Sequence, residues 1–347
     1  MRAPDPILAE DLCGILSAEL PWEALYGRHI LVTGASGFIG GHAVEALAWL
    51  NRCRPDANLH IYALARDVQK LRQRLAWLDL PGEITPLIQD VTQPVDTDLP
   101  LDFIIHAASP ASPRHYLDQP VQTILANTEG TRLWLEHARK HNARLLFLSS
   151  GAVYGENTLQ IEAISETDFG GEDPLGPRAC YSESKRLAET LSRAYHVQYG
   201  VDARIARISH CYGPGMRLDD GRAISDLLAD VLSDRDIRLD SDGSASRPFC
   251  YSSDMVLGLL HILLKGGAGE AYNVGETVET SILELAHKII AAAGKSNRLR
   301  VKTKALSAIA PAARSSGHFN INKIRALGWG PRISLDAGLR RLLQVRS

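Results

Sequence analysis

Short apolar runs alternate with longer helical stretches over the region from residue 29 to residue 199. Each apolar run is followed within two residues by a glycine, a small residue or an acidic residue, which is typical of strands buried inside a sheet. The predicted strands span 29–33, 59–65, 84–88, 102–106 and 144–149, and the predicted helices span 41–50, 121–141 and about 177–199. Strands and helices that alternate in this way predict an α/β fold with a doubly wound parallel sheet.

The ends of the chain depart from this alternation. Residues 5–20 predict a helix placed before the sheet, because Asp5 can cap it and apolar residues then recur near helical spacing. We expect this helix to pack against the main domain or against a second subunit. Beyond Tyr212 the alternation loosens, with helices predicted at 225–232 and 253–265 and loops at 213–215 and 240–248.

Three glycines follow the first predicted strand at a spacing of three residues, and a helical run from Gly41 to Leu50 comes next. Glycine lets a backbone turn tightly and approach a ligand without a Cβ in the way. The first turn of the helix adds unpaired N–H groups and the positive end of its dipole, which suit a pyrophosphate. Strand, glycine turn and helix in this order predict a dinucleotide site, formed by Gly34, Ser36, Gly37, Phe38, Ile39 and Gly40.

The ends of the next strands carry residues that would meet other parts of the dinucleotide. Arg66 ends the second strand, where it can stack on adenine or pair with a 2′-phosphate, as in NADP sites. Asp67 follows it, and an acidic residue here could bind the ribose 2′-hydroxyl of NAD. These two residues therefore do not decide between NAD and NADP. The third and fourth strands end in acidic and small residues that we also place beside the cofactor, namely Asp90, Val91, Ala107 and Ala108.

Composition narrows the function without naming it. The chain has 347 residues, 45% of them hydrophobic and 22% charged, with a formal net charge of −2. This balance gives no basic surface for nucleic acid, and no apolar run is long enough to span a bilayer. The five cysteines lack the pairing of a disulfide framework and the spacing of metal ligands, and the acidic N-terminus does not resemble a secretory signal. We therefore expect a cytoplasmic protein without a metal site.

A tyrosine and a lysine one helical turn apart form the candidate catalytic pair. Tyr181 and Lys185 open the helix that runs to about Tyr199, and at a spacing of four they share a helix face. A nearby ammonium would favour the phenolate and lower the tyrosine pKa towards working pH. Tyr181 then becomes a general base for a sugar hydroxyl, with Ser150 at the end of the fifth strand as its hydrogen-bonding partner.

These motifs resemble those of the extended short-chain dehydrogenases/reductases, in the group of NAD-dependent nucleotide-sugar epimerases and dehydratases. The likeness runs from about Arg28 to the end of the chain. Further matching strings are Asn127–Thr131, Tyr212–Pro214, Arg247–Asp254, Asn273–Gly275 and Leu327–Trp329. The resemblance implies a Rossmann-like dinucleotide-binding domain at 28–208 plus about 251–275, a smaller substrate-binding lobe at about 209–250 and 276–347, and a helical extension at 1–27.

The same resemblance implies roles for single residues. The glycine turn and Asn127 would hold the cofactor, while Lys185 would orient its ribose and support Tyr181. Arg247 would bind the diphosphate of a sugar nucleotide. A homodimer is also implied, paired through the predicted helices at 121–141 and 179–199.

Within that group the nearest likeness is to UDP-glucuronate decarboxylases, which favours a UDP-sugar as substrate. Three strings carry this likeness: Ser109–Tyr116, Gly176–Tyr181 and Asp220–Arg222. The substrate pocket is therefore expected to include Ser109 and Arg178. Arg222 either meets a sugar carboxylate or is an exposed residue at a helix start.

Two departures from the group bear on the reaction. Decarboxylases and 4,6-dehydratases carry an acidic residue directly after, or two places after, the position of Ser150, where this chain has Gly151 and Ala152. Without that acid, elimination of water is not expected and decarboxylation is in doubt. His210 stands where relatives usually have an asparagine facing the nucleotide sugar, so it replaces that donor, marks a different substrate or is merely tolerated.

Together the residues predict hydride transfer at C4 of a nucleotide sugar. Tyr181 would remove the hydroxyl proton, and the C4 ketone would most simply be reduced again, as in an epimerase acting on a UDP-hexose or a UDP-uronic acid. Two alternatives stay open within the family: an NADPH-dependent 4-keto-sugar reductase, which Arg66 suits, and a UDP-glucuronate decarboxylase. The alternative outside it is a non-catalytic dinucleotide-binding scaffold, against which the complete set of Ser150, Tyr181 and Lys185 argues.

Overall fold

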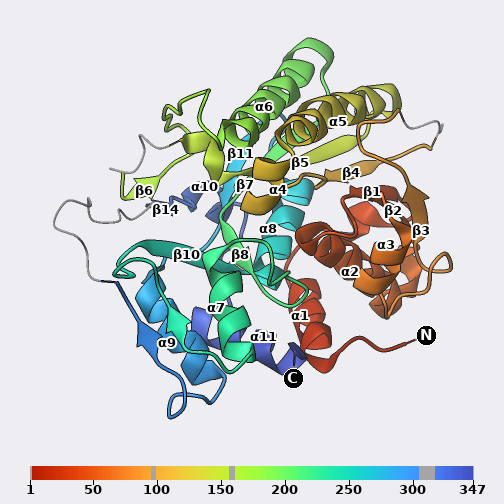
Figure 1. Ribbon diagram of the computed structural model, residues 1–347. Coiled ribbons are helices and arrows are strands. Elements are labelled where there is room, and N and C mark those ends of the chain that lie inside the picture. The colour runs from red at the N-terminus through yellow and green to blue at the C-terminus, as the bar shows by residue number, and fades with distance from the viewer. Residues whose placement is uncertain (1, 95–98, 156–160, 305–316, 347) are drawn as a thin grey trace.

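A seven-stranded parallel sheet forms the centre of the computed structural model, which describes residues 2–94, 99–155, 161–304 and 317–346 (Figure 1). The strand order is β11-β7-β5-β4-β1-β2-β3. The strands are β1 (His29–Thr33), β2 (His60–Ala65), β3 (Thr85–Ile88), β4 (Phe103–His106), β5 (Arg144–Ser150), β7 (Ala203–Ile208) and β11 (Ala271–Val274). The order reverses between β1 and β4, where doubly wound sheets bind their ligands. The expected doubly wound parallel sheet is confirmed.

Successive residues of the central strands face opposite layers of helices, as the two-residue period of a strand requires. In β5, Phe147 faces a core shared with α5 and α6, whereas Leu146 faces the larger core shared with α2 and α8. These four helices span Pro120–His141, Ala179–Tyr199, Phe38–Cys53 and Ser252–Lys265, respectively. Figure 1 shows α5 and α6 side by side on one face of the sheet.

A separate apolar core joins segments from the second half of the chain, including Leu228, Ile289 and Leu342. The elements of this region are α7 (Ala223–Leu232), α9 (Ile282–Ala292), α11 (Leu335–Arg346), β8 (His210–Tyr212), β9 (Ile237–Arg238), β10 (Ser246–Tyr251), β12 (Glu279–Ser281) and β13 (Val301–Lys302). The expectation of a loop over 240–248 is wrong at its end. Residues 246–248 begin β10 because they pair antiparallel with β12.

The remaining elements are too short to show a period in the sequence. They are η1 (Trp22–Leu25), η2 (Pro55–Ala57), α3 (Val68–Arg74), α4 (Pro113–Asp118), η3 (Gly151–Tyr154), β6 (Ala163–Ile164), β14 (His318–Phe319) and α10 (Asn322–Arg325). β6 pairs with β14, which brings two distant parts of the chain together. Among the helices described, none combines the length and the apolar character that crossing a membrane requires.

The first helix, α1 (Pro6–Leu16), packs on the main body of the protein. Asp5 caps it by accepting a hydrogen bond from the backbone N–H of Ile7 at 2.9 Å. Leu12 and Ile15 are buried in the core that α2 and α8 share. Of the two positions expected for this helix, the structure thus shows the one against the main domain.

A buried carboxylate fixes α1 in that place. Asp11 accepts a hydrogen bond from the hydroxyl of Tyr251 at 2.8 Å and another from Nη1 of Arg341 at 2.8 Å. Tyr251 ends β10 and Arg341 lies in α11, so this one side chain joins the first helix to the last (Figure 1).

A second buried carboxylate anchors α3 to α2. Glu45 is 1% exposed, and its oxygens accept hydrogen bonds from Nη1 and Nη2 of Arg74 at 2.9 and 3.0 Å and from Nε1 of Trp77 at 3.0 Å. Nδ1 of His42 lies 3.0 Å from the same carboxylate. Burial would raise the pKa of Glu45, but the charge of Arg74 and the hydrogen bond with His42 outweigh it and lower the pKa to about 2. Glu45 is therefore ionised inside the protein.

Candidate active site

The glycine turn connects β1 to α2 at the point where the strand order reverses. Gly34 has a φ of +67°, a left-handed conformation that suits glycine, and a Cβ there would lie 2.9 Å from the Ala108 backbone. A Cβ on Gly40 would lie 2.5 Å from the carbonyl oxygen of Gly34. Gly37 precedes α2 and has no side chain that could cap its first N–H groups. This cradle of bare backbone at a helix start fits a dinucleotide phosphate.

We expect Gly34→Ala to weaken dinucleotide binding by at least about tenfold, since a tenfold change needs only about 1.4 kcal/mol. The new methyl group must collide with Ala108 as well as bear left-handed strain. Titration calorimetry with NAD measures the affinity. Gly200→Ala is the matched control, because Gly200 has a φ of +72° but nothing within 4 Å of its Cβ position. Equal affinity in both variants would remove the cradle from the binding site.

The end of β2 leaves the choice between NAD and NADP open. Arg66 is exposed there, and its Nη1 lies 3.8 Å from Oδ2 of Asp90. Asp67 caps α3, since its Oδ1 accepts hydrogen bonds from the backbone N–H groups of Gln69 and Lys70 at 2.8 and 3.1 Å. The structure thus brings Arg66 beside the acidic end of β3 and gives Asp67 a local structural role.

Three other expected cofactor residues lie around the next strand end. Burial would raise the pKa of Asp90, but hydrogen bonds from the N–H and hydroxyl of Thr92 outweigh it and lower the pKa. Val91 is buried. Asn127 of α5 is fully buried and donates from Nδ2 to the Ser184 hydroxyl at 2.9 Å, whereas its Oδ1 accepts no hydrogen bond from the described residues.

Hydrogen bonds connect the end of β1 to the end of β4. The Thr33 hydroxyl lies 2.8 Å from Nδ1 of His106 and accepts a hydrogen bond from the N–H of Ala108 at 3.1 Å. Burial lowers the pKa of His106 to about 3, so this histidine is a neutral packing residue. Ala107, Ala108 and Ser109 follow it at the strand end, as expected for a place where a ligand passes close.

The candidate catalytic residues meet at the carboxyl end of β5. Ser150 ends that strand, Tyr181 and Lys185 lie near the start of α6, and a hydrogen bond joins the Ser150 and Tyr181 side chains. Lys185 is 3% exposed. Its Nζ donates to the Leu148 carbonyl at 2.7 Å and lies 6.0 Å from the centre of the Tyr181 ring.

The pKa of Tyr181 does not follow the sequence-based expectation. Burial raises it, and the hydrogen bond from Ser150 only opposes this in part. Burial also lowers the pKa of Lys185 to about 7, against the opposing charge of Glu189. The expected lowering of the Tyr181 pKa by Lys185 is therefore wrong for the protein as described, because burial has the largest effect on the pKa of Tyr181 and raises it.

Tyr116 is a neighbour of Tyr181 that sequence reasoning missed. It lies in α4 and is 3% exposed, and the two rings stack with their centres 5.2 Å apart and their planes at 19°. Stacking of this kind contributes about 0.5–1.5 kcal/mol beyond burial and fixes ring orientation. No sequence pattern connects these two tyrosines, since they lie on separate helices.

Basic side chains gather next to Tyr181. The charges of Arg247, Arg222 and Arg178 all act on His210, and that of Arg222 also acts on Tyr181. Burial first, and then these three charges, lower the pKa of His210 to about 4. His210 is nevertheless exposed to solvent. The arrangement suits an anionic ligand beside a neutral imidazole.

Arg222 is already paired within the protein. Its Nε donates to Oδ2 of the buried Asp220 at 2.7 Å, and its Nη1 donates to the Cys211 carbonyl at 3.5 Å. The Arg222 side chain is 31% exposed. It is therefore only partly accessible to solvent, and not the exposed arginine at a helix start that the sequence allowed. Over the described ranges, no three His, Cys, Asp or Glu side chains gather as a metal site would need.

The position directly after Ser150 has a structural reason to lack an acid. A Cβ on Gly151 would lie 2.8 Å from Cζ of Phe319, which comes from β14. Phe319 also packs edge-on against Tyr154, with ring centres 5.7 Å apart. While Phe319 occupies this place, any side chain at residue 151 must displace it.

The comparison with protein families agrees with this geometry. The model of the NAD dependent epimerase/dehydratase family matches residues 30–275. The chain belongs to this family. Membership confirms the expected family and the expected class of enzyme, an NAD(P)-dependent nucleotide-sugar enzyme of the extended short-chain dehydrogenase/reductase type.

Curated relatives within the epimerase/dehydratase family include UDP-glucuronic acid decarboxylases. UDP-glucuronic acid decarboxylase 6 of Arabidopsis thaliana is 35% identical over 311 residues, covering 89% of this chain and 86% of the relative. UDP-glucuronic acid decarboxylase 1 of Xenopus tropicalis is 34% identical over 318 residues, covering 91% of this chain and 71% of the relative.

Solved structures of the family share the fold and differ in their reactions. UDP-glucuronic acid 4-epimerase from Bacillus cereus, in complex with UDP-glucuronic acid and NAD, has a TM-score of 0.74 at 25% identity and covers 91% of this chain and 98% of that one. A dTDP-glucose 4,6-dehydratase from Streptomyces venezuelae with NAD bound has a TM-score of 0.75 at 26% identity, with 91% and 96% covered. Family membership therefore does not determine which reaction this chain catalyses, and the reaction has to be inferred from the residues of its own site.

Proposed function

We propose that this chain transfers a hydride at C4 of a nucleotide-activated sugar and returns the C4 alcohol, as an epimerase does. The observation that carries the proposal is the convergence of Ser150, Tyr181 and Lys185 at the carboxyl end of the sheet. This is the edge from which the glycine turn also extends. A UDP-hexose or UDP-uronic acid is the proposed substrate.

Each residue has a stated part in the proposed reaction. Tyr181 takes the proton of the C4 hydroxyl, and Ser150 hydrogen-bonds that hydroxyl and aligns it. Lys185 holds the cofactor ribose, and the glycine turn holds the pyrophosphate. When bound, the nicotinamide supplies hydride acceptance and return at C4. NAD is the proposed cofactor because the family and its solved structures use it, with NADP as the alternative that Arg66 suits.

The group of basic side chains beside Tyr181 is the proposed substrate site. Arg247 and Arg178 would meet the diphosphate, since guanidinium groups match phosphate oxygens in pairs of hydrogen bonds. Arg222 would meet a sugar carboxylate with the part of its side chain that stays open. Sugar hydroxyls would be bound by Ser109 and His210. The buried hydroxyl of Ser109 forms no hydrogen bond with any described residue and is free to do so.

Decarboxylation is a second candidate because the curated relatives carry that name at 34–35% identity. A 4-keto uronic acid is a β-keto acid and loses carbon dioxide with little help once it forms. The test is UDP-glucuronate labelled with carbon-13 at C6, followed by NMR. A C4-inverted uronate without labelled carbon dioxide supports epimerisation, and labelled carbon dioxide with a UDP-pentose supports decarboxylation.

Net reduction of a 4-keto sugar is a third candidate, favoured by the raised pKa of Tyr181. A phenol that keeps its proton suits protonation of a ketone oxygen. We would denature the purified protein and identify any released dinucleotide by mass. Tightly held NAD is the expected result, because an epimerase recycles its cofactor within each turnover. An empty protein that binds NADPH from solution would favour the reductase.

We also propose a homodimer paired through α5 and α6. Five large apolar side chains are exposed on these two helices: Val121, Ile124, Leu125, Leu187 and Val197. Exposed apolar groups that gather in a patch usually mark an interface, so they support the proposed dimer. Light scattering is expected to give about twice the chain mass of 37.9 kDa.

Adding charge to this face tests the homodimer. The double variant Leu125→Glu and Leu187→Glu is expected to be a monomer at micromolar concentration. Val278→Glu is the control, since Val278 is 68% exposed and belongs to neither α5 nor α6. A monomeric wild type, or a double variant that stays dimeric, would contradict the proposed interface.

A cytoplasmic location is proposed from the thiols. The five cysteines are all free, and Cys211 and Cys250 are buried. Free thiols persist in a reducing compartment, whereas oxidising compartments favour disulfides.

A further inference from the structure

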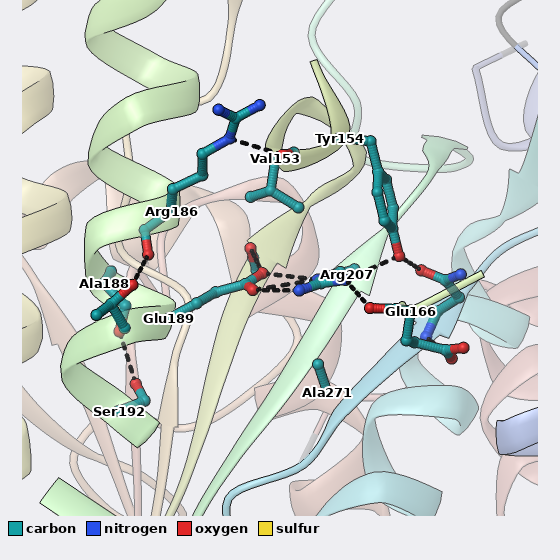
Figure 2. A network of polar contacts seen from close by, with 12 residues as sticks. Val153, Tyr154, Glu166, Arg186, Ala188, Glu189, Ser192, Arg207 and Ala271 are labelled. Atoms are coloured by element: carbon teal, nitrogen blue, oxygen red, sulfur yellow. Dashed lines mark hydrogen bonds and ion pairs between the residues drawn. The ribbon is translucent and has the colours of Figure 1, made fainter. Parts of the chain in front are cut away.

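A buried ion pair joins Arg207 to Glu189, which lies on the helix that carries Tyr181 and Lys185 (Figure 2). Arg207 of β7 donates from Nε and Nη2 to the carboxylate of Glu189 on α6, with a shortest distance of 2.7 Å. The two side chains are 12% and 11% exposed. A two-pronged contact of this kind fixes the orientation of both partners.

The carboxylate of Glu189 also connects the two elements that carry the candidate catalytic groups. The Ser149 hydroxyl donates to Oε1 of Glu189 at 2.5 Å. Ser149 directly precedes Ser150 in β5, and Glu189 lies one helical turn after Lys185 in α6. One hydrogen bond therefore relates the strand that bears Ser150 to the helix that bears Tyr181 and Lys185.

Arg207 extends this contact to the segment that follows Ser150. Its Nη1 donates to the Tyr154 hydroxyl at 3.1 Å and to the Glu166 carbonyl at 2.9 Å. The Tyr154 hydroxyl in turn donates to Oδ1 of Asn273 at 2.6 Å. Figure 2 shows Glu189 and Arg207 pointing toward one another, with Tyr154 and Glu166 on the far side of the guanidinium. Ser150 is thus held through the residue before it and through the short helix after it.

We propose that Glu189 is a positioning residue which, held by Arg207, fixes α6 against the end of β5 and so keeps Ser150 opposite Tyr181 and Lys185. The inference rests on the proposed function for the roles of those three residues. A contribution to stability does not by itself explain why an ion pair of Glu189 and Arg207 is buried here, because an apolar pair of similar volume usually stabilises a core as well or better.

The charge of Glu189 also acts on Lys185, whose pKa it raises. Lys185 faces the Tyr181 phenol and Glu189 on its own helix, the neutral His106 of β4, and the Phe147 ring of β5 with Nζ 4.7 Å from its centre. Glu189 is the anion that opposes the effect of burial on the ammonium. Arg207 pairs with Glu189 and balances its charge.

Two variants separate the charge of Glu189 from its hydrogen bond. Glu189→Gln keeps an acceptor for Ser149 and removes the charge, whereas Ser149→Ala keeps the charge and removes the bond. We expect each to lower kcat by at least about tenfold with KM within about twofold. Glu189→Gln is also expected to shift the alkaline limb of the pH profile to lower pH, since Lys185 then loses its proton earlier. Ser149→Ala is expected to leave that limb in place.

Asp202→Asn is the matched control. Asp202, whose side chain is 31% exposed, forms an ion pair with the buried Arg204, which lies on the same strand as Arg207 but near its opposite end. This variant is expected to lower the melting temperature and leave kcat and the pH profile unchanged. If Glu189→Gln behaves like Asp202→Asn, the pair is merely structural and the inference is overturned.

A readout without substrate keeps this test separate from that of the proposed function. In protein labelled with nitrogen-15 lysine, NMR follows the titration of the Lys185 ammonium, assigned by its loss in Lys185→Met. A lower titration midpoint in Glu189→Gln supports the inference even if no nucleotide sugar is turned over. An unchanged midpoint together with unchanged kcat overturns it. If Glu189→Gln does not fold, Ser149→Ala decides, and a normal kcat there contradicts the positioning role.

Discussion

Tyr181→Phe is expected to lower kcat by about 10²–10⁴-fold, the usual contribution of a general acid or base. Phenylalanine keeps the ring that stacks on Tyr116 and loses only the hydroxyl that Ser150 contacts. The melting temperature and the affinity for NAD should therefore stay close to those of the wild type. The measurement is steady-state turnover of the substrate identified with labelled UDP-sugars.

Tyr195→Phe serves as the control for the loss of a hydroxyl from the same helix. The Tyr195 hydroxyl donates to Oε1 of Glu136 at 2.8 Å, on the side of α6 that packs on α5. Its removal should not change kcat. Undiminished turnover in Tyr181→Phe would exclude Tyr181 as the proton-transferring group, and the choice among epimerase, decarboxylase and reductase would then need another acid or base.

Arg74→Met is expected to destabilise the protein by about 3–5 kcal/mol at pH 7, because it leaves the buried carboxylate of Glu45 without its ion-pair partner. The low folded-state pKa of Glu45 sets the pH dependence. Its stabilising contribution is fully present above its usual value of 4.5 and is lost as the pH falls toward about 2. Urea unfolding across this range should show the difference between variant and wild type shrinking at acid pH.

A double variant distinguishes loss of the ion pair from loss of packing around Arg74. Adding Glu45→Gln removes the stranded charge, so the double variant should recover a large part of the lost stability. If Arg74→Met alone costs less than about 1 kcal/mol, which is the range of an exposed pair, Glu45 is not held as the structure indicates.

Periodicity predicted the elements that have a long apolar pattern. The five predicted strands and the helices α5 and α6 lie within a few residues of their expected bounds. The pairing of β6 with β14 could not be predicted, since two residues in each strand show no period. The same holds for the start of β10, which contains Pro248 and depends on β12 for its pairing.

The candidate site was predictable where chemistry follows a local pattern. Tyr181 and Lys185 share a helix face, and Ser150 ends a strand. Glu189 carries the same signal, four residues beyond Lys185, and could have been found by extending that face one turn. Phe319 could not, because its contact with Gly151 joins parts of the chain far apart in sequence.

The bond between Asp11 and Arg341 spans 330 positions of the chain, and this separation matters while the protein is being made. Synthesis proceeds from the N-terminus, so α1 leaves the ribosome long before α8 and α11, on which it will rest. Until then Leu12 and Ile15 have no complete surface to cover them, and exposed apolar surface of this kind makes an incompletely folded chain prone to aggregate. Of the described helices, α1 thus depends for part of its packing on helices that are translated much later.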